Sequence, residues 1–271
     1  MTLELIDIGI NLTHDSYDAD REAVLQRAIE AGVVQFVVTG ASAAGSRAAL
    51  SLAHAAPRIL RATAGCHPHH AVDLDDAALA TITELAADPL VVAIGETGLD
   101  YHRNFSAPRE QRLAFERQLQ LAARSGKPLF LHERDAHADF MAILREHAPS
   151  LPRLGGRPRA VLHCFTGNAA QLDACLEFGL WIGITGWICD ERRGVHLREL
   201  VARIPAGRLM IETDGPYLLP RDLDPKPASR RNEPMHLAHI ARVVAQLRGE
   251  PVAALAAHTT ATARDFFDLP A

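Results

Sequence analysis

The sequence is poor in cysteine and aromatic residues and has no long apolar run. Its four cysteines form no Cys-x-x-Cys pair and are too sparse for a disulfide framework in a chain of 271 residues. No apolar stretch approaches the roughly 18 residues that a membrane helix needs, and the acidic start, with Glu4 and Asp7, lacks a signal-peptide pattern. We expect reduced thiols, a cytoplasmic location and no membrane partner. The cysteines are Cys66, Cys164, Cys175 and Cys189.

The charge and composition exclude several further classes of protein. A net charge of −5 argues against a surface that binds duplex nucleic acid broadly, although it allows a local basic channel or a metal site. With 48% hydrophobic and 23% charged residues, the chain is neither disordered, collagen-like nor a coiled coil. Histidine is abundant, with 14 residues. Their positions along the chain therefore matter.

Short β-branched runs alternate with longer helical patterns from end to end, which is typical of βαβ units and a parallel sheet. This alternation predicts a single-domain α/β fold over residues 1–271, a TIM-type (β/α)₈ barrel, since such barrels commonly run to about 250 residues. A doubly wound open sheet is the alternative. The eight predicted strands end near Asp7, Thr39, Gly65, Gly95, His132, His163, Ile184 and Glu212.

Capping and loop signals refine this prediction. A helix is expected over 106–125, with Ser106 as its possible cap, Pro108 in the first turn and Gly126 after the last turn. Residues 216–234 are rich in proline and charge and predict a long loop after the eighth strand. One or two closing helices should follow Pro234.

Five predicted strands end in histidine or carboxylate residues. Because barrel active sites lie at the carboxyl ends of the strands, these side chains should meet at one mouth. A divalent cation would balance their charge and use their lone pairs. The strands end in the segments 65–70, 95–100, 131–135, 163–167 and 212–216.

Four of these residues form the predicted metal site: Glu96, His132, His163 and Asp214. Two carboxylates and two neutral imidazoles accept Mg²⁺, Mn²⁺ or Zn²⁺, and the set has no thiolate that would favour a soft metal.

Several segments, in the same order along the chain, resemble the signature segments of the TatD family of metal-dependent deoxyribonucleases: 65–69, 95–101, 163–167, 182–186, 212–214 and 231–234. Segments 7–13, 187–194 and 216–223 resemble the TatD branch itself. The resemblance spans nearly the whole chain.

The resemblance implies an amidohydrolase-like barrel that acts as a Mg²⁺-dependent 3′→5′ exonuclease on single-stranded DNA and, in some members, RNA, with a role in DNA repair. Glu96, His132, His163 and Asp214 match the family's metal and catalytic positions, and His67 matches a further active-site histidine. In the expected mechanism the ion activates water. Asp214 accepts the proton of that water, and His67 steadies the phosphate or protonates the leaving oxygen.

One departure from the family pattern concerns the number of ions. Many members carry a His-x-His pair after the first strand, where this chain has Gly9 and Asn11. Two ligands are thereby lost, which weakens the case for a tightly bound two-metal centre. Asn11 and Asp7 remain possible oxygen donors, although Asp7 could equally be a buried strand residue.

The substrate-binding residues are expected in the same strand-end loops. Arginines there could follow the phosphates of a strand, and aromatic rings could stack on its bases. The candidates are Arg134, Arg192, Arg193, Arg221, Arg231, Tyr101 and Tyr217.

Two other functions remain open. Another metallohydrolase on the same barrel, such as an aminoacyl-tRNA deacylase or a lactonase, would use the same metal residues. A non-catalytic nucleic-acid-binding protein is a more distant alternative. The sequence indicates no stable protein partner and does not determine the oligomeric state.

Overall fold

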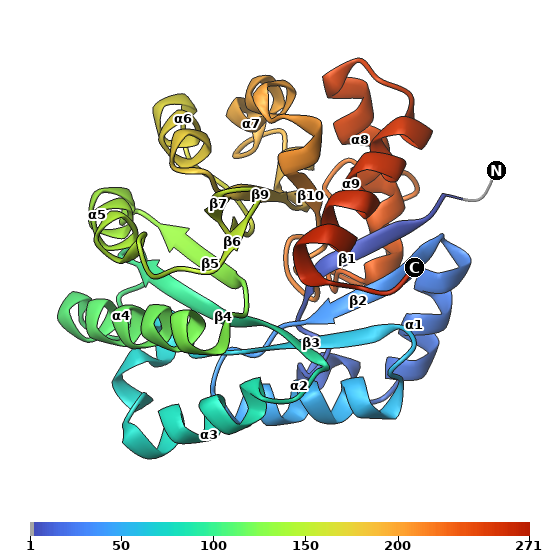
Figure 1. Ribbon diagram of the computed structural model, residues 1–271. Helices are drawn as coiled ribbons and strands as arrows, with labels where there is room; N and C mark the ends of the chain where they lie inside the picture. The colour runs from blue at the N-terminus through green and yellow to red at the C-terminus, as the bar shows by residue number, and fades with distance from the viewer. Residues whose placement is uncertain (1–2) are drawn as a thin grey trace. The chain divides into compact units, whose positions relative to one another are not determined.

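The computed structural model describes residues 3–271. Its main sheet has eight strands, which neighbour one another in chain order: β1-β2-β3-β4-β5-β8-β9-β10. Helices lie between successive strands along the chain (Figure 1). This is the predicted (β/α)₈ topology, and the predicted strand ends are confirmed at seven of the eight positions to within a few residues. The strands are β1 Leu5–Ile10, β2 Val33–Val38, β3 Leu60–Ala64, β4 Val91–Asp100, β5 Leu129–Arg134, β8 Ala160–Leu162, β9 Trp181–Ile184 and β10 Leu209–Ile211.

Two closing helices, α8 and α9, follow the long loop after β10, as expected. A short antiparallel hairpin of β6 Arg153–Leu154 and β7 Arg157–Pro158 was not predicted. The helices are α1 Arg21–Glu30, α2 Ala43–Ala55, α3 Asp76–Ala86, α4 Pro108–Ser125, α5 His137–His147, α6 Ala169–Phe178, α7 Val195–Leu200, α8 Leu237–Arg248 and α9 Val252–Phe267. Short 3-10 turns include η2 Pro68–Asp73, η3 Gly186–Cys189 and η6 Pro234–His236.

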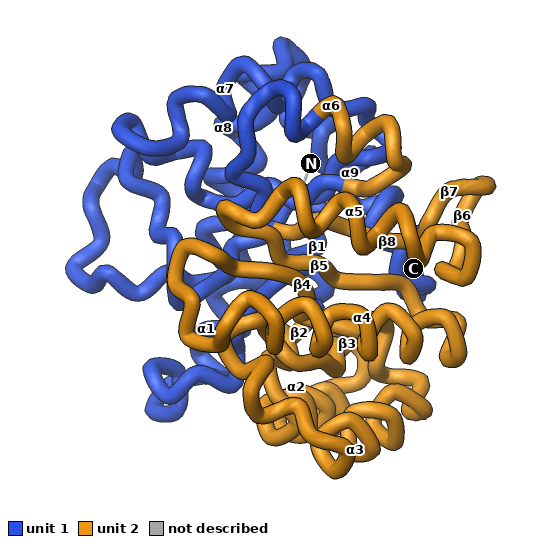
Figure 2. Tube along the Cα trace, turned by 90° about the vertical axis from the view of Figure 1, so that its left-hand side faces the viewer, with its two compact units in different colours: residues 1–37, 164–172, 182–271 blue, residues 38–163, 173–181 orange. Residues whose placement is uncertain are grey.

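The chain divides into two compact units (Figure 2). Unit 1 comprises Met1–Val37, Cys164–Leu172 and Ile182–Ala271, and unit 2 comprises Val38–His163 and Asp173–Trp181. Within unit 2, β3 pairs with β4, β4 with β5, and β5 with β8, all in parallel, and α4 packs on β4. Within unit 1, β9 pairs with β10 in parallel. No helix of residues 3–271 is long and apolar enough to cross a membrane.

Strand β4 runs beyond its predicted end at Gly95 and continues to Asp100. Gly95 and Gly98 have φ of 146° and 148°, where a side chain would be strained. A Cβ at Gly95 would lie 2.2 Å from the carbonyl oxygen of Phe130, and one at Gly98 would lie 1.9 Å from that of His132. Both glycines therefore let β4 approach β5 closely, and this extends the strand along the edge where His132 lies.

The start of α4 corrects one prediction. Ser106 does not cap the helix, because its hydroxyl accepts the Val72 N–H and donates to the carbonyl oxygen of His69. The cap residue is Ala107, whose N–H donates to the Glu110 carboxylate at 2.8 Å. Gly126 ends the helix with φ of 72°, as predicted.

In unit 1 the first and last strands are joined at their carboxyl ends. The Asp214 N–H donates to the Gly9 carbonyl, and the Asn11 N–H donates to the Gly215 carbonyl. Asp7 is fully buried in β1, where its carboxyl group accepts hydrogen bonds from the N–H and hydroxyl of Thr213. These hydrogen bonds lower the pKa of Asp7, but burial outweighs them and raises it to about 7. Asp7 is thus a buried strand residue that joins β1 to the segment after β10.

The raised pKa of Asp7 predicts a pH dependence of stability. Because the folded protein holds this proton more tightly than the unfolded chain, stability should fall as pH rises from about 4 to about 7. Asn cannot titrate, so Asp7→Asn is the reference. Relative to this variant, the free energy of unfolding of the wild type should fall by on the order of 1–4 kcal/mol over that range. Urea unfolding at several pH values measures the difference. If the difference in free energy of unfolding between the two proteins stayed constant with pH, the raised pKa of Asp7 would be contradicted.

Candidate metal centre

One carboxylate oxygen of Glu96 is surrounded by imidazole nitrogens. Glu96 Oε1 lies 2.8 Å from His163 Nε2 and 2.9 Å from His132 Nδ1. It also lies 3.3 Å from His67 Nε2. All four residues belong to unit 2 and are largely buried. Three of the four predicted metal-site residues, together with the predicted active-site histidine, are therefore in direct contact.

The parallel strands of unit 2 bring these side chains together. Glu96 and His132 lie on β4 and β5, which pair so that Gly98 is opposite His132. His67 follows β3, and His163 follows β8, where its N–H donates to the Leu131 carbonyl at 2.9 Å. All four positions are thus at or near the carboxyl ends of neighbouring strands, as the sequence predicted.

The imidazoles keep the Glu96 carboxylate ionised. Burial alone would favour the neutral acid, but the nearby His163 and His67 lower the pKa of Glu96 well below its ordinary value. Burial likewise opposes the charged form of His132, yet the neighbouring carboxylates of Asp100 and Glu96 raise the pKa of this histidine. The centre therefore contains a buried anion at neutral pH.

His67 acts as a hydrogen-bond donor through Nε2. Its Nδ1 accepts the backbone N–H of His69 at 3.0 Å, so this nitrogen must carry a lone pair. Burial lowers the pKa of His67 to about 4, so the ring is neutral near pH 7 and carries one proton. That proton must sit on Nε2, which faces Glu96. The neutral His67 ring thus directs an N–H toward the Glu96 carboxylate.

A carboxylate behind the centre orients its histidines. Asp100 Oδ1 accepts the backbone N–H groups of His102 and Arg103, each at 2.9 Å. Asp100 Oδ2 lies 2.9 Å from His69 Nε2 and 3.4 Å from His132 Nε2. A carboxylate behind a ligating histidine fixes the ring orientation and raises its basicity. Asp100 stands in that position relative to His132.

The residues present fit a divalent cation. Donor atoms of His67, Glu96 and His132 lie within 4.8 Å of one another. His163 Nε2 lies 2.8 Å from Glu96 Oε1. The buried Nε2 of His132 makes no hydrogen bond to any described residue and lies 3.4 Å from Asp100, while Nδ1 of the same ring faces Glu96. Glu96 and the histidines around it are thus the residues that could hold an ion in unit 2.

Asp214, the fourth predicted metal-site residue, lies in unit 1. Its φ is 53°, and its Oδ1 accepts a hydrogen bond from Asn11 Nδ2 at 2.9 Å. The neighbouring Glu212 is fully buried and accepts the Cys164 N–H at 2.6 Å. The Asn11 amide thus orients the Asp214 carboxylate, while the ligand and proton-acceptor roles of Asp214 stay predictions.

The predicted substrate-binding arginines differ in how firmly they are paired. Arg231 donates to Asp20 at 2.7 Å and to Glu233 at 2.7 Å, and these carboxylates raise its pKa. Such a network favours a structural role for Arg231. Arg192, by contrast, has a side chain that is 58% exposed and lies 4.0 Å from Asp190.

The other predicted substrate-binding residues lie in strand-end loops or at strand ends. Arg193 lies over the Trp187 ring at 5.6 Å, and Arg221 lies 3.6 Å from Glu191. Arg134 ends β5 and is half-buried. The Tyr101 hydroxyl donates to Asp139, whereas Tyr217 is 52% exposed. Their contact with a substrate stays a prediction.

Three residues near the centre were not predicted as site residues. His69 and Asp100 form the contact described above, and Phe105, which is 66% exposed, packs edge-on against His69 at 4.8 Å. The two-residue period of a strand would have placed Asp100 on the face of Glu96, had β4 been extended to residue 100. No sequence signal separates Phe105 from other loop aromatics.

Replacement of Asp100 tests the orienting role. Asp100→Asn should weaken Mn²⁺ binding about 10- to 100-fold, because it removes the carboxylate charge 3.4 Å behind His132 Nε2, which raises the basicity of the ring. Asp139→Asn, which changes a carboxylate of α5 in the same unit, serves as the matched control. Calorimetric titration with Mn²⁺ measures both, and circular dichroism checks folding. Equal affinities for Asp100→Asn and wild type would remove Asp100 from the centre.

The chain is similar to a known family over most of its length. The family described as TatD related DNase matches residues 6–268. A protein named 3′-5′ ssDNA/RNA exonuclease TatD from Erwinia billingiae is 53% identical over 267 residues, which cover 98% of this chain and 100% of the relative. The protein of the same name from Erwinia amylovora is 54% identical over 265 residues, with the same coverage.

Solved structures agree with this similarity. A TatD homologue from Escherichia coli has a TM-score of 0.87 at 29% identity, with 100% of both chains covered. A TatD family hydrolase from Entamoeba histolytica has the same TM-score and coverage at 26% identity.

Proposed function

Because the chain belongs to the TatD related DNase family, we propose that it is a metal-dependent 3′→5′ exonuclease that hydrolyses the phosphodiester bonds of single-stranded DNA and RNA. The observation that carries this proposal is the buried, ionised Glu96 among three imidazoles. The full-length relatives that bear the exonuclease name support it.

Phosphodiester hydrolysis must overcome the repulsion between an anionic phosphate and its nucleophile. A bound divalent cation, Mg²⁺ by our prediction with Mn²⁺ and Zn²⁺ as alternatives, supplies a Lewis acid that acidifies water and offsets phosphate charge. Glu96, His132 and His163 would hold it. Asp100 would keep the His132 ring aligned.

His67 can stabilise the phosphate directly. Its neutral ring donates through Nε2, so it can hydrogen-bond a phosphate oxygen without first gaining a proton. With a pKa of about 4, it is a poor source of a proton for the leaving 3′-oxygen near pH 7. Of its two predicted roles, the structure therefore favours steadying the phosphate.

The remaining parts of the proposal rest on the sequence. They are a single domain over residues 1–271, a cytoplasmic location, a role in DNA repair, and no stable protein partner. The match of one family over residues 6–268 supports the single domain.

A cleavage assay tests the activity. Wild type with Mg²⁺ or Mn²⁺ should shorten a 5′-labelled single-stranded oligonucleotide stepwise, and a chelator should stop the reaction. Glu96→Gln should lower the rate by a factor on the order of 100 or more, because the carboxylate that holds the ion is lost. Glu146→Gln, on the exposed side of α5, should cleave as wild type does.

One further variant and one further substrate complete the assay. Asp214→Ala should also inactivate the enzyme if its predicted role holds. An oligonucleotide with a blocked 3′ end should resist, and equal cutting of that substrate would indicate an endonuclease. Cleavage that survives both the chelator and Glu96→Gln would refute the proposed function.

The exposed Phe105 beside His69 offers a ring on which the terminal base can stack. Phe105→Ala should raise KM for single-stranded DNA with little change in kcat. The rise should correspond to a loss of about 1–3 kcal/mol of stacking free energy. Leu113→Ala removes an equally exposed apolar side chain from α4 and should have no effect. An unchanged KM in Phe105→Ala would show that Phe105 does not contact the substrate.

A further inference from the structure

Unit 1 contains a second group of metal-binding side chains, formed by Cys189, Asp222 and His239. One donor atom from each lies within 4.8 Å of the others. Cys189 ends η3, Asp222 lies in the loop after β10, and His239 lies in the first turn of α8. Three segments that are separate in the sequence thus direct a thiol, a carboxylate and an imidazole to one point.

The contacts within this group are short. His239 Nε2 lies 2.7 Å from Asp222 Oδ1, and the Cys189 sulfur lies within 4.8 Å of the donor atoms of both residues. Cys189 is fully buried, whereas the side chains of His239 and Asp222 are 20% and 37% exposed. The thiol therefore forms the closed inner side of the group, and the other two donors form its outer side.

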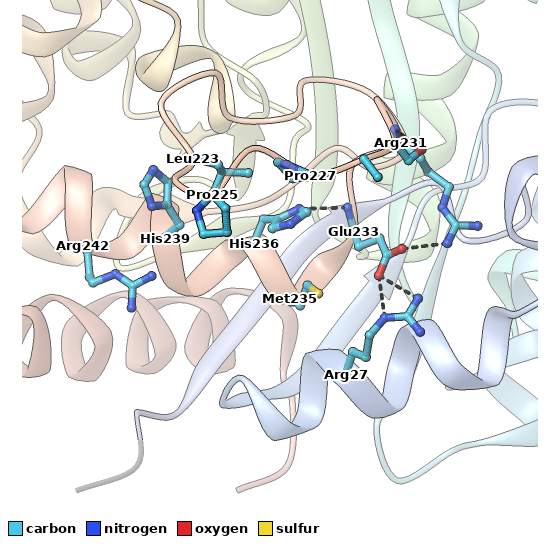
Figure 3. Close-up of a pocket in the computed structure, with 12 residues that line it drawn as sticks. Arg27, Leu223, Pro225, Pro227, Arg231, Glu233, Met235, His236, His239 and Arg242 are labelled. Carbon is cyan, nitrogen blue, oxygen red and sulfur yellow. Dashed lines mark hydrogen bonds and ion pairs between the residues drawn. The ribbon is translucent and has the colours of Figure 1, made fainter.

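The outer side of the group reaches solvent, because the side chains of His239 and Asp222 are both partly exposed. His239 also lines a pocket of about 480 Å³, together with His236 and Arg242 (Figure 3). Zinc sites with three protein ligands complete a tetrahedron with water. Solvent water at this exposed side can take the fourth position.

The chemistry of the three donors selects the ion. A thiolate with an imidazole and a carboxylate suits Zn²⁺, whereas Mg²⁺ avoids sulfur. Zinc bonds of about 2.0–2.3 Å at tetrahedral angles separate the donors by about 3.3–3.8 Å. Donors already within 4.8 Å reach that spacing by small side-chain rotations. The Glu96 centre has no thiol and differs from this group in kind.

We infer that Cys189, Asp222 and His239 form a Zn²⁺ site that fastens the loop after β10 to η3 and α8. Binding exchanges the Cys189 S–H proton for a sulfur–zinc bond, and the proton passes to solvent. The ion replaces the hydrogen bond between His239 and Asp222 and restrains the loop that carries Tyr217 and Arg221.

Cobalt substitution tests this site without reference to nuclease activity. Only a thiolate ligand produces the near-ultraviolet charge-transfer absorption of bound Co²⁺, so the Glu96 centre is silent in this measurement. Metal-free wild type titrated with Co²⁺ should show the band at one equivalent, and Zn²⁺ should abolish it. Cys175→Ser, which replaces another buried free cysteine, should behave as wild type.

Variants at the three positions decide the outcome. Cys189→Ser should lose the band entirely, and His239→Gln should weaken Co²⁺ binding at least about tenfold. Circular dichroism and Mn²⁺ binding at the Glu96 centre verify that each variant is folded. Absence of the band in wild type, or its persistence in Cys189→Ser, would overturn the inference. Because no nucleic acid is used, failure here leaves the proposed exonuclease function untouched.

Discussion

The charge of the Glu96 carboxylate is the constraint on which the site depends. A buried anion is costly unless positive or hydrogen-bonding partners surround it, and here three imidazole nitrogens approach a single oxygen. The backbone adapts to that arrangement, since Gly95 and Gly98 permit the close passage of β4 along β5. Asp100 then extends the network outward through His69 and His132. The same interactions that stabilise the anion in the folded protein prepare it to hold a cation.

Much of this centre was predictable because strand ends follow simple rules. Hydrophobic runs located the strands, and parallel pairing then placed Glu96, His132 and His163 at one edge of the sheet. The extension of β4 was harder to predict, because it depends on how closely two backbones approach. Asp100 was overlooked for that reason. The prediction that Ser106 caps α4 was wrong for a similar reason. Its hydroxyl hydrogen-bonds residues 69 and 72, which are distant in sequence.

The tautomers of histidine rings and the ion-pair partners of arginines also could not be predicted from the sequence. The donor role of His67 depends on the backbone N–H of His69, and the structural pairing of Arg231 depends on Asp20 and Glu233. The cysteines show the same limit. A count of four isolated cysteines predicted reduced thiols, and none of the four forms a disulfide bond, but only the fold places Cys189 beside a carboxylate and an imidazole. The two units thus carry donor groups of different chemistry.

The most direct test of the central claim is the position of a cation in crystals grown with Mn²⁺, located by its anomalous scattering. The account predicts a peak at bonding distance, about 2.0–2.3 Å, from the Glu96 carboxylate and from imidazole nitrogens of His132 and His163. A fully occupied Mn²⁺ peak elsewhere, with none bonded to Glu96, would contradict the account.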